Sequence, residues 1–512
     1  MQLKKCARTS GSALWLYFVC TVSRNAFCFG RSTCGAVQFK SLFAMKHYDL
    51  IVIGSGPAGE KAALFAAYHG YRAALVEKSS QLGGAGTNTG TMPSKTLKET
   101  ALYLSGMMEK GVFGVNRTLD HEAGIKDFFY RKNVVTDLQG SDTRKNLIEH
   151  QVDVYHGEAS FKDATTVSIA GEPACLISAD YIVIATGSYP FHIPGIPFDG
   201  QHVHDSDTIL TLDHIPTSMV IVGAGVIGCE YATIFAAMGC QVSLVNGRDD
   251  FLTFIDKEII EALRERMEAD GVTFIMNNRV EGVEIDSSGD QPVVHAHLTN
   301  GQPIEAEMFL YAAGRSGNTA KLNLAAAGLE ANSRGLIEVD GTYQTKVPHI
   351  YAVGDVIGFP ALGSTSMDQG RVAVTHIFNL HEFERIDQEI PYGIYTIPEV
   401  SSVGLSEEGA RDKGLSYGVG RAYYRDMPRG RILGLNHGLL KVIFEQGTER
   451  ILGIHIIGKN ATDLIHTGLL MVEENMTLRR AAGLIYNFPT LNELYKYACM
   501  DGLRNSTPSV KA

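Results

Sequence analysis

Residues 48–78 read YDLIVIGSGPAGEKAALFAAYHGYRAALVEK, and residues 218–248 read SMVIVGAGVIGCEYATIFAAMGCQVSLVNGR. Each stretch has a short apolar run, a glycine-rich turn, an alanine-rich segment of helical length and a second apolar run. The turns share the spacing G-x-G-x-x-G: Gly54, Gly56 and Gly59 in the first, and Gly223, Gly225 and Gly228 in the second. One such turn would be a weak signal. Two of them, in matching strand–helix–strand units, predict two dinucleotide-binding domains in an α/β chain.

Each glycine of the turn has its own physical task. The first permits a tight turn, the second lets a pyrophosphate approach the backbone, and the third lets the helix pack closely on the strand. The free N–H groups and the positive end of the helix dipole then hold the phosphates.

The residue that ends the second strand of each unit predicts which nucleotide is accepted. Glu77 follows Gly59 by 18 residues, and its carboxylate can accept hydrogen bonds from an adenosine ribose diol. Asn246 follows Gly228 by the same 18 residues. An amide there does not repel the 2′-phosphate of NADP, and Arg248 can pair with it, so the second domain is expected to accept NAD and NADP. The alternative is that Asn246 and Gly247 only form a turn after the strand.

Three further motifs extend this pattern. Residues 181–190 (YIVIATGSYP) and 308–319 (MFLYAAGRSGNT) each place a turn of small residues after an apolar run, and we expect each to return the chain to its own nucleotide. In YAVGDV, Asp355 stands behind Gly354 at a strand end, a position suited to a polyol hydroxyl. The last 120 or so residues lack a glycine motif and alternate strand and helix patterns, which predicts a separate α+β domain.

The N-terminal 44 residues differ in composition from the rest. They contain six basic residues and no acidic one, in a chain of net charge −11. This composition is typical of an organellar targeting peptide, for a mitochondrion or plastid, while the apolar run of residues 13–22 fits the h-region of a signal peptide. The alternative is that Met45 is the functional start and the protein is cytoplasmic. An acidic body makes nucleic acid and anionic membranes poor partners, and no apolar run reaches the roughly 18 to 20 residues of a membrane span.

Four cysteines follow this segment, and none has paired spacing. We expect free buried thiols at Cys175, Cys229, Cys240 and Cys499. No His, Cys or Asp cluster has metal-ligand spacing, so no metal site is predicted.

Together, the two glycine turns, ATG, AAGR, GDV, the PSK of residues 93–95 and the C-terminal α+β segment resemble the pyridine nucleotide-disulphide oxidoreductases, from about Tyr48 to Leu503. The resemblance implies two Rossmann-like domains, for FAD and for NAD(P), and a C-terminal dimerisation domain that makes a homodimer. It divides the chain into a targeting segment (1–44), an FAD-binding domain in two parts (45–205 and 326–388), an NAD(P)-binding domain (206–325) and a dimerisation domain (389–512). It implies an ion pair of Lys95 and Glu230 beside the flavin. The implied cofactor- and nucleotide-binding residues are Gly54, Gly56, Gly59, Glu77, Lys78, Gly84, Lys95, Thr186, Gly187, Gly223, Gly225, Gly228, Asn246, Arg248, Gly314, Gly354 and Asp355.

The chain departs from this family where disulphide chemistry is done. The family's redox cysteines would stand in GGAGTNTGTMPSK (83–95), but this sequence has Gly86 and Thr91 at the two positions. Its C-terminal FPTLNE has Phe488 in place of the family's acid/base histidine and retains Glu493. Glycine cannot form a disulphide and a phenyl ring cannot carry a proton.

These losses leave the flavin and nicotinamide machinery without a disulphide substrate. The pattern, with GAGVIGCEYA and VIGFPAL, resembles the transhydrogenase branch of the family. The resemblance implies ping-pong exchange: NADPH passes a hydride to flavin N5 and NAD⁺ removes it from the same site. The alternatives are a dehydrogenase with a quinone or oxygen acceptor, and a redox-silent nucleotide-binding flavoprotein.

Overall fold

The computed structural model describes residues 45–106, 124–171, 173–386 and 389–506. The predicted targeting segment, residues 1–44, lies outside the described residues. Residues from Met45 onward form one compact unit with three main sheets. No helix in the described ranges is long and apolar enough to cross a membrane.

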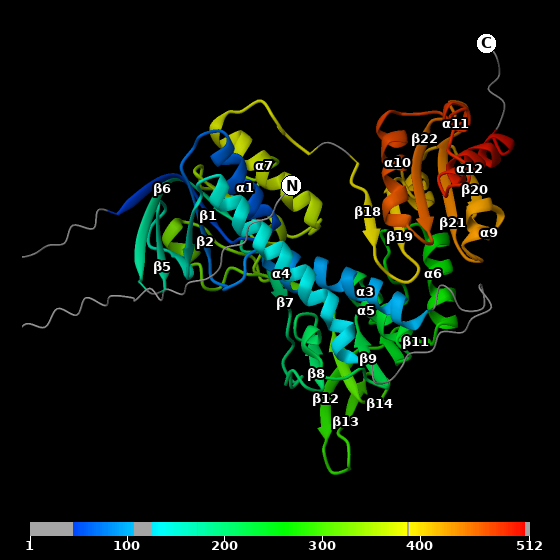
Figure 1. The fold of residues 1–512 in the computed structure, drawn as a ribbon, viewed down its shortest axis with the longest axis horizontal. Helices are drawn as coiled ribbons and strands as arrows, with labels where there is room; N and C mark the ends of the chain where they lie inside the picture. Colours follow the sequence, from blue (N-terminus) through cyan, green and yellow to red (C-terminus); the bar gives the residue numbers. More distant parts are fainter. Residues whose placement is uncertain (1–44, 107–123, 172, 387–388, 507–512) are drawn as a thin grey trace, which may run out of the picture. The chain divides into compact units, whose positions relative to one another are not determined.

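The first sheet has seven strands in the order β3-β2-β1-β6-β5-β4, with β17 paired to β6. Figure 1 labels β1, β2, β5 and β6 of this sheet. Its strands are β1 (Lys46–Ile53), β2 (Ala73–Glu77), β3 (Asp153–His156), β4 (Glu158–Phe161), β5 (Thr166–Ala170), β6 (Cys175–Ile184) and β17 (Ile350–Ala352). The pairs β1–β2, β1–β6, β2–β3 and β6–β17 are parallel, while β4 and β5 form an antiparallel edge. Because β17 returns here after the whole second sheet, this fold unit is built from two separate parts of the chain.

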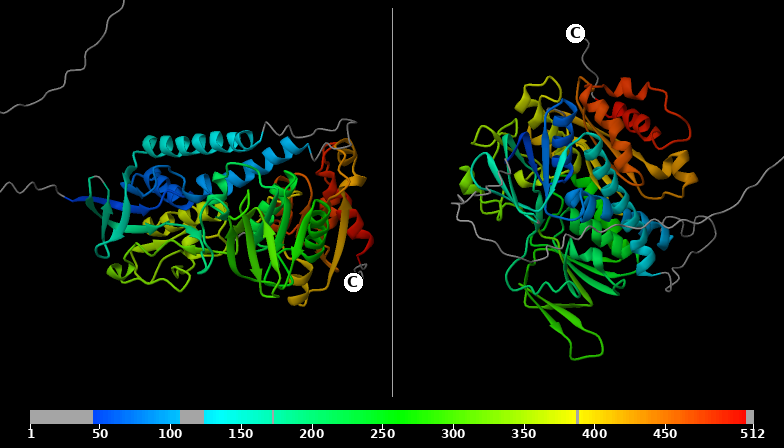
Figure 2. Two further views of the ribbon diagram at one scale, coloured as in Figure 1. Left: turned by 90° about the horizontal axis from the view of Figure 1, so that it is seen from below. Right: turned by 60° about the vertical axis from the view of Figure 1, so that its left-hand side comes forward.

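Two helices beside this sheet pack closely on each other because the residues at their contact are small. α1 (Pro57–Tyr68) packs against α7 (Gly363–Phe378). A Cβ on Gly370 would lie 2.4 Å from the carbonyl oxygen of Ala58, so no larger residue fits at the crossing. The other helices of this part are α2 (Gly84–Asn88), α3 (Thr91–Ser105) and α4 (Ile125–Glu149). Figure 2 shows α4 lying along the outer side of α3.

The second sheet repeats the first on a smaller scale. Its five parallel strands have the order β11-β10-β9-β15-β8: β11 (Val272–Ile275), β10 (Gln241–Val245), β9 (Ser218–Val222), β15 (Met308–Tyr311) and β8 (Val203–Asp205). α5 (Val226–Ala237) and α6 (Lys257–Ala269) accompany it, with a small antiparallel sheet of β12 (Val280–Asp286), β13 (Val293–Leu298) and β14 (Pro303–Ala306). The chain enters and leaves this part through a two-stranded ribbon, β7 (Ser188–Pro190) with β16 (Arg315–Gly317).

The third sheet is antiparallel, in the order β18-β19-β22-β21-β20. Its strands are β18 (Tyr392–Ile394), β19 (Val400–Gly404), β20 (Tyr417–Tyr423), β21 (Leu439–Glu445) and β22 (Ile451–Ile457). Its helices are α8 (Glu407–Asp412), α9 (Pro428–Ile432), α10 (Ala461–Glu473), α11 (Leu478–Ala482) and α12 (Glu493–Arg504); short 3₁₀ turns are η2 (Thr208–Thr211), η3 (Leu324–Ala327), η4 (Gly354–Ile357) and η5 (Tyr424–Asp426). The predicted α/β fold, with two Rossmann-like domains and a C-terminal α+β domain, is confirmed.

Candidate active site

A cavity of about 1220 Å³ lies where elements of all three sheets meet. It is bounded by the first glycine turn, residues 84–95, the ends of β6 and β17, α5, Arg315, and then Tyr392, Tyr395 and α10 of the third part. The predicted residues that line it are Gly54, Gly56, Glu77, Lys78, Gly84, Lys95, Thr186, Gly187, Glu230, Gly354 and Asp355. Those that do not line it are Gly59, Gly223, Gly225, Gly228, Asn246, Arg248 and Gly314.

The two glycine turns have nearly the same geometry. Gly54 has φ +106° and Gly223 has φ +102°, a region that favours glycine. A Cβ on Gly59 would lie 2.0 Å from the oxygen of Gly54, and one on Gly228 would lie 1.8 Å from the oxygen of Gly223. The third glycine of each motif therefore permits the helix to begin directly against its own turn.

The turns of small residues after β6 and β15 lie against the two glycine turns. A Cβ on Gly54 would lie 2.3 Å from the oxygen of Ala185, and one on Gly223 would lie 2.9 Å from the oxygen of Ala312. The ATG and AAG segments therefore pack directly on the glycine turns.

Glu77 anchors the first turn. Its Oε2 accepts hydrogen bonds from the backbone N–H of Ser55 (2.9 Å) and from its hydroxyl (2.7 Å), and Oε1 accepts from the N–H of Ser79 (2.8 Å). A carboxylate has about four acceptor sites. Glu77, which lines the cavity, therefore retains capacity for a ribose hydroxyl.

Asn246 occupies the equivalent place in the second unit but is used differently. Its Oδ1 accepts from the N–H of Ala224 (3.3 Å), as Glu77 accepts from Ser55, but its Nδ2 donates to the carbonyls of Arg248 (3.1 Å) and Asp250 (3.0 Å). Both amide N–H donors are thus spent on the 246–250 turn. Toward a nucleotide Asn246 can offer only its oxygen, and the two sequence interpretations, a nucleotide contact and a turn, are both compatible with this geometry.

Residues 83–95 lie against the first glycine turn. A Cβ on Gly84 would lie 2.8 Å from Cα of Gly56, and one on Gly86 would lie 2.8 Å from Cγ of Pro57. Close packing of the two loops therefore leaves no room for a side chain at Gly86 without movement of Pro57. Thr91 begins α3, whose second turn presents Lys95 to the cavity.

Lys95 and Glu230 form an ion pair at the cavity wall. Lys95 Nζ lies 2.6 Å from Oε2 and 2.8 Å from Oε1 of Glu230, whose side chain is only 4% exposed. Oε1 also accepts from the N–H of Tyr395 (3.0 Å), and Nζ lies 4.8 Å from the centre of the Tyr395 ring. The pair joins α3 to α5; its role beside a flavin stays a prediction.

Tyr395 belongs to a second group of site residues that carries no sequence motif. The Lys98 ammonium lies 5.9 Å from the centre of the Tyr395 ring and forms ion pairs with Glu99 and the buried Glu399. Glu399 accepts hydrogen bonds from the N–H (3.1 Å) and the hydroxyl (2.8 Å) of Thr462 at the start of α10. Lys98 is 3% exposed. The third part of the chain is therefore tied to α3 by a buried charge pair.

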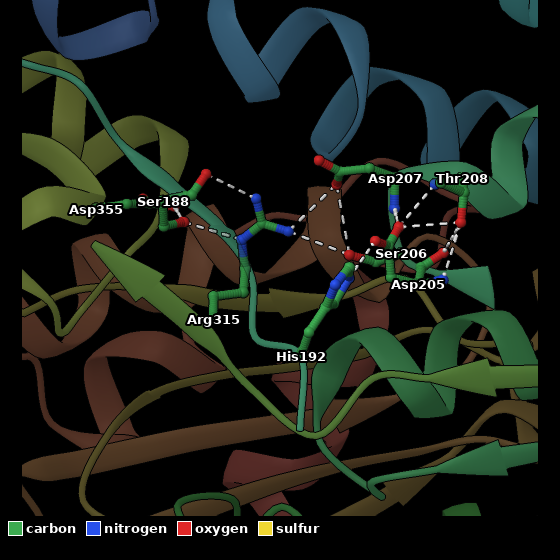
Figure 3. A network of polar contacts seen from close by, with 8 residues as sticks. All are labelled: Ser188, His192, Asp205, Ser206, Asp207, Thr208, Arg315 and Asp355. Atoms are coloured by element: carbon green, nitrogen blue, oxygen red, sulfur yellow. Dashed lines mark hydrogen bonds and ion pairs between the residues drawn. The ribbon is translucent and has the colours of Figure 1, made fainter. Parts of the chain in front are cut away.

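Arg315 links the two crossings of the chain between the first and second sheets (Figure 3). Its Nε donates to Ser188 Oγ and its Nη2 to the Ser188 carbonyl, both at 2.9 Å, while Nη1 reaches Ser206 Oγ (3.1 Å) and Asp207 (3.3 Å). Ser188 Oγ in turn donates to Asp355 Oδ2 (2.8 Å). A continuous chain of contacts thus runs from Asp355 to the first residues of the second sheet.

The pKa values of two aspartates in this network are shifted in opposite directions. Burial raises the pKa of Asp207, although Arg315 opposes it. Burial also acts on Asp205, but the N–H of Thr208 and the side chain of His192, 2.7 Å away, hold its pKa below the ordinary value. The sequence motif AAGR contained Arg315, but nothing in it identified these partners, which come from β7 and the turn after β8.

Two buried hydroxyls that line the cavity have no hydrogen-bond partner within the described part of the chain: Thr186 Oγ1 and the Tyr231 hydroxyl. Unpaired buried hydroxyls are costly. Together with the side-chain-free loops around Gly56 and Gly84, they indicate that the cavity is shaped for a polar ligand with phosphate and hydroxyl groups.

The C-terminal motif lies elsewhere. Phe488 is 68% exposed and Ile485 is 97% exposed, and neither lines the cavity. Glu493 is buried, and its Oε2 has no partner among the residues that the structure describes. The position aligned with the family's acid/base histidine thus lies on the surface of this chain.

The thiols of the described residues are all free. Cys229, Cys240 and Cys499 are buried, as expected, whereas Cys175 is only partly buried because it begins β6 next to the edge strands, which corrects the expectation of four buried thiols. Burial raises the pKa of Cys240 and Cys499 to about 12. No three His, Cys, Asp or Glu side chains in the described ranges gather as a metal site.

Comparison with known proteins agrees with this geometry. Residues 48–375 match the family described as pyridine nucleotide-disulphide oxidoreductase, and residues 390–499 match the dimerisation domain of that family. The chain is 42% identical over 460 residues to the soluble pyridine nucleotide transhydrogenase of Mycobacterium tuberculosis (strain ATCC 25177 / H37Ra), covering 89% of this chain and 97% of the relative. It is 40% identical over 463 residues to the protein of the same name from Yersinia pestis (strain Pestoides F), covering 89% and 98%.

Solved structures resemble it as well. The HOCl-induced flavoprotein disulfide reductase RclA from Escherichia coli, in its Cu(II) complex, has a TM-score of 0.80 at 27% identity and covers 89% of this chain and 99% of its own. LpdA from Mycobacterium tuberculosis has a TM-score of 0.81 at 23% identity, with the same coverage, and supports the fold alone.

Proposed function

The chain belongs to the pyridine nucleotide-disulphide oxidoreductase family, and we propose that it exchanges hydride between NADPH and NAD⁺ through bound FAD. One observation carries this proposal. The cavity has the Lys95–Glu230 pair and the glycine turn of a flavin site, yet Gly86 and Thr91 stand where the family's disulphide reductases place cysteines.

The residues of the cavity fit FAD. The first glycine turn offers free N–H groups at the start of α1, Glu77 and Asp355 offer carboxylates for hydroxyls, and Thr186 Oγ1 is a buried hydroxyl in need of a partner. When bound, FAD supplies a two-electron carrier that accepts a hydride from one nicotinamide and gives it to another. Residues 54–56, 77, 186 and 355 would hold it.

Lys95 supplies positive charge to the cavity wall. The buried carboxylate of Glu230, with hydrogen bonds from Lys95, Tyr395 N–H and Ser94 Oγ, fixes the ammonium group in one place. A fixed cation lowers the energy of negative charge that develops nearby during hydride transfer.

The cavity wall offers no thiol. No cysteine is among the described residues that line the cavity, and burial raises the pKa of Cys229, next to Glu230, far above neutrality. A thiol relay is therefore missing, and the second substrate must take the hydride directly. We infer that NADPH and NAD⁺ use the same approach in turn, which is a ping-pong sequence.

The proposal is tested by initial rates with NADPH and the thio analogue of NAD⁺ in the absence of oxygen. We expect parallel lines in double-reciprocal plots, because one nucleotide must leave before the other reacts. Intersecting lines would contradict the ping-pong sequence. Turnover with a quinone but none with the NAD⁺ analogue would instead identify a dehydrogenase.

We also propose that residues 1–44 direct the chain to an organelle, on the basis of their basic, acid-free composition. A fluorescent reporter fused behind these residues should leave the cytoplasm. A reporter that stays there would support Met45 as the functional start.

We expect the protein to act as a homodimer, because residues 390–499 match a dimerisation domain and this part exposes Ile485 and Phe488. Exposed apolar side chains of this size are costly in water and are typical of interfaces.

A further inference from the structure

Two arginines flank the turn that ends β10 in the second nucleotide-binding sheet. Arg248 follows Asn246 in the chain, while Arg279 comes from the segment before β12. The parallel pairing of β10 with β11 places them together, because Val245 is the register partner of Ile275. Beyond the strands, the N–H of Asn278 donates to the Asn246 carbonyl (3.0 Å) and the N–H of Asn277 to the Arg248 carbonyl (3.3 Å).

The Arg279 side chain lies across Gly247. A Cβ built on Gly247 would stand 3.2 Å from both Cγ and Nε of Arg279. The backbone of Arg279 is held by Thr299: its N–H donates to Thr299 Oγ1 (3.2 Å) and its carbonyl accepts from the Thr299 N–H (2.9 Å). Its side chain thus starts from a fixed point and passes over the turn.

Both guanidinium groups have free hydrogen-bonding capacity. Arg248 and Arg279 are exposed, and neither side chain takes part in an ion pair or hydrogen bond within the described part of the chain. By contrast, Arg264 and Arg266 on the neighbouring α6 pair with Glu268 and Asp270. The nearby Asp249 is bound to Asn277 Nδ2 at 3.0 Å.

The position of the two arginines at the end of β10 indicates which part of a dinucleotide they would contact. In a dinucleotide-binding unit, the adenosine ribose lies at the end of the second strand, which here is β10. Asn246 cannot donate to a group at the ribose 2′ position, because its amide N–H groups bond the carbonyls of Arg248 and Asp250. A 2′-phosphate therefore needs other donors, and planar guanidinium forks match a phosphate well.

We propose that Arg279, from the segment between β11 and β12, joins Arg248 in binding the adenosine 2′-phosphate of NADP(H) and is the residue that determines specificity for NADP(H). NAD leaves both groups in water, and Asn246 Oδ1 can accept from its free 2′-hydroxyl. This inference rests on the proposed use of both dinucleotides, and it explains how one site tolerates both without a carboxylate.

Fragment binding to the FAD-loaded protein tests the proposal without hydride transfer. We compare 2′,5′-ADP, which carries the 2′-phosphate, with 5′-AMP by isothermal titration calorimetry. Arg279→Ala should weaken 2′,5′-ADP by about 10- to 100-fold, because charge-assisted hydrogen bonds are lost. It should change the dissociation constant of 5′-AMP less than about twofold, since that fragment has no 2′-phosphate and makes no such contact. The affinity of Arg279→Lys for 2′,5′-ADP should lie between those of wild type and Arg279→Ala.

Two further variants separate a direct contact from a structural effect. Gly247 does not have positive φ, so Gly247→Ala should act only by displacing Arg279, and it should add nothing to Arg279→Ala. As a control, Arg264→Ala removes a half-buried arginine on α6, beside the same sheet, and should leave the binding of both fragments unaffected.

Equal weakening of both fragments by Arg279→Ala would overturn the proposal and assign Arg279 a structural role. Unchanged binding of 2′,5′-ADP would also overturn it. Because neither fragment has a nicotinamide ring, the result stands whether or not the protein transfers hydride between NADPH and NAD⁺, so failure of one proposal is distinguishable from failure of the other.

Discussion

Replacing Lys441 by methionine tests how the second sheet is fixed to the C-terminal part of the chain. Lys441 on β21 is 1% exposed, and its Nζ lies 2.7 Å from Asp256 Oδ1, 2.9 Å from Glu258 and close to Glu407. Asp256, fully buried, is the N-cap of α6. The lysine thus neutralises the charge that holds the start of α6 against β21 and α8.

The loss of folding free energy in Lys441→Met depends on the hydrogen bonds that each of the three carboxylates retains. Glu258 retains two hydrogen bonds from Arg421, at 2.7 and 2.8 Å, and Glu407 retains one from Tyr417. Asp256 retains only two backbone N–H groups, at 3.1 and 3.2 Å, and no ion-pair partner within the described part of the chain. Breaking a buried pair costs about 3 to 5 kcal/mol, and the two remaining bonds place our expectation at about 3 kcal/mol.

Urea denaturation followed by far-ultraviolet circular dichroism measures this loss. Asn at position 256 removes the buried charge, so Lys441→Met with Asp256→Asn should be more stable than Lys441→Met alone. Although burial opposes it, His455, Lys441 and the N–H of Glu407 hold the pKa of Asp256 below its ordinary 3.8. This stabilisation is fully present above pH 3.8 and is lost as the pH falls through the lowered pKa of Asp256, so the difference in stability between wild type and Lys441→Met should narrow only below pH 3.8. A double variant less stable than the single one would refute the reasoning.

Three further changes have defined outcomes. Lys95→Met leaves the buried Glu230 without its cation and should slow reduction of the flavin by NADPH by about 10- to 100-fold in stopped-flow absorbance, with Lys95→Arg intermediate; equal rates would contradict a role at the site. Asn246→Glu should weaken the binding of NADPH more than the binding of NADH, by about 1 to 3 kcal/mol in titrations, through charge repulsion and loss of the hydrogen bonds within the turn. Equal loss of affinity for both nucleotides would mean that residue 246 does not face the 2′ position. Ile485→Glu with Phe488→Glu should convert dimer to monomer in size-exclusion chromatography with light scattering, and a dimer of unchanged stability would place the interface elsewhere.

The glycine turns predicted both parallel sheets from sequence because their spacing is set by one contact. A Cβ five residues after Gly54 or Gly223 would stand only 2.0 or 1.8 Å from the oxygen of that glycine, so only glycine at 59 or 228 lets the helix begin there. The Lys95–Glu230 pair was predictable only through the family resemblance, since the two residues are far apart in the chain.

Tertiary packing determines what the sequence did not reveal. Tyr395 and the Lys98–Glu399 pair reach the site through β18, β19 and α10, which have no motif of their own. Arg279 lies beside Asn246 only because β11 pairs with β10, and the spent donors of Asn246 depend on the turn that follows it. At position 86, the sequence shows only that glycine replaces a cysteine. The contact with Pro57, which explains why a side chain does not fit there, is seen only in the structure.

Double-mixing stopped-flow spectroscopy without oxygen tests the central claim most directly. The FAD-loaded protein is mixed with one equivalent of NADPH until the flavin absorbance is bleached, and then with NAD⁺. Hydride exchange through one site predicts that NAD⁺ restores the flavin absorbance and forms an equal amount of NADH. Absorbance that stays bleached with NAD⁺ but recovers with a quinone or oxygen would contradict the proposed function.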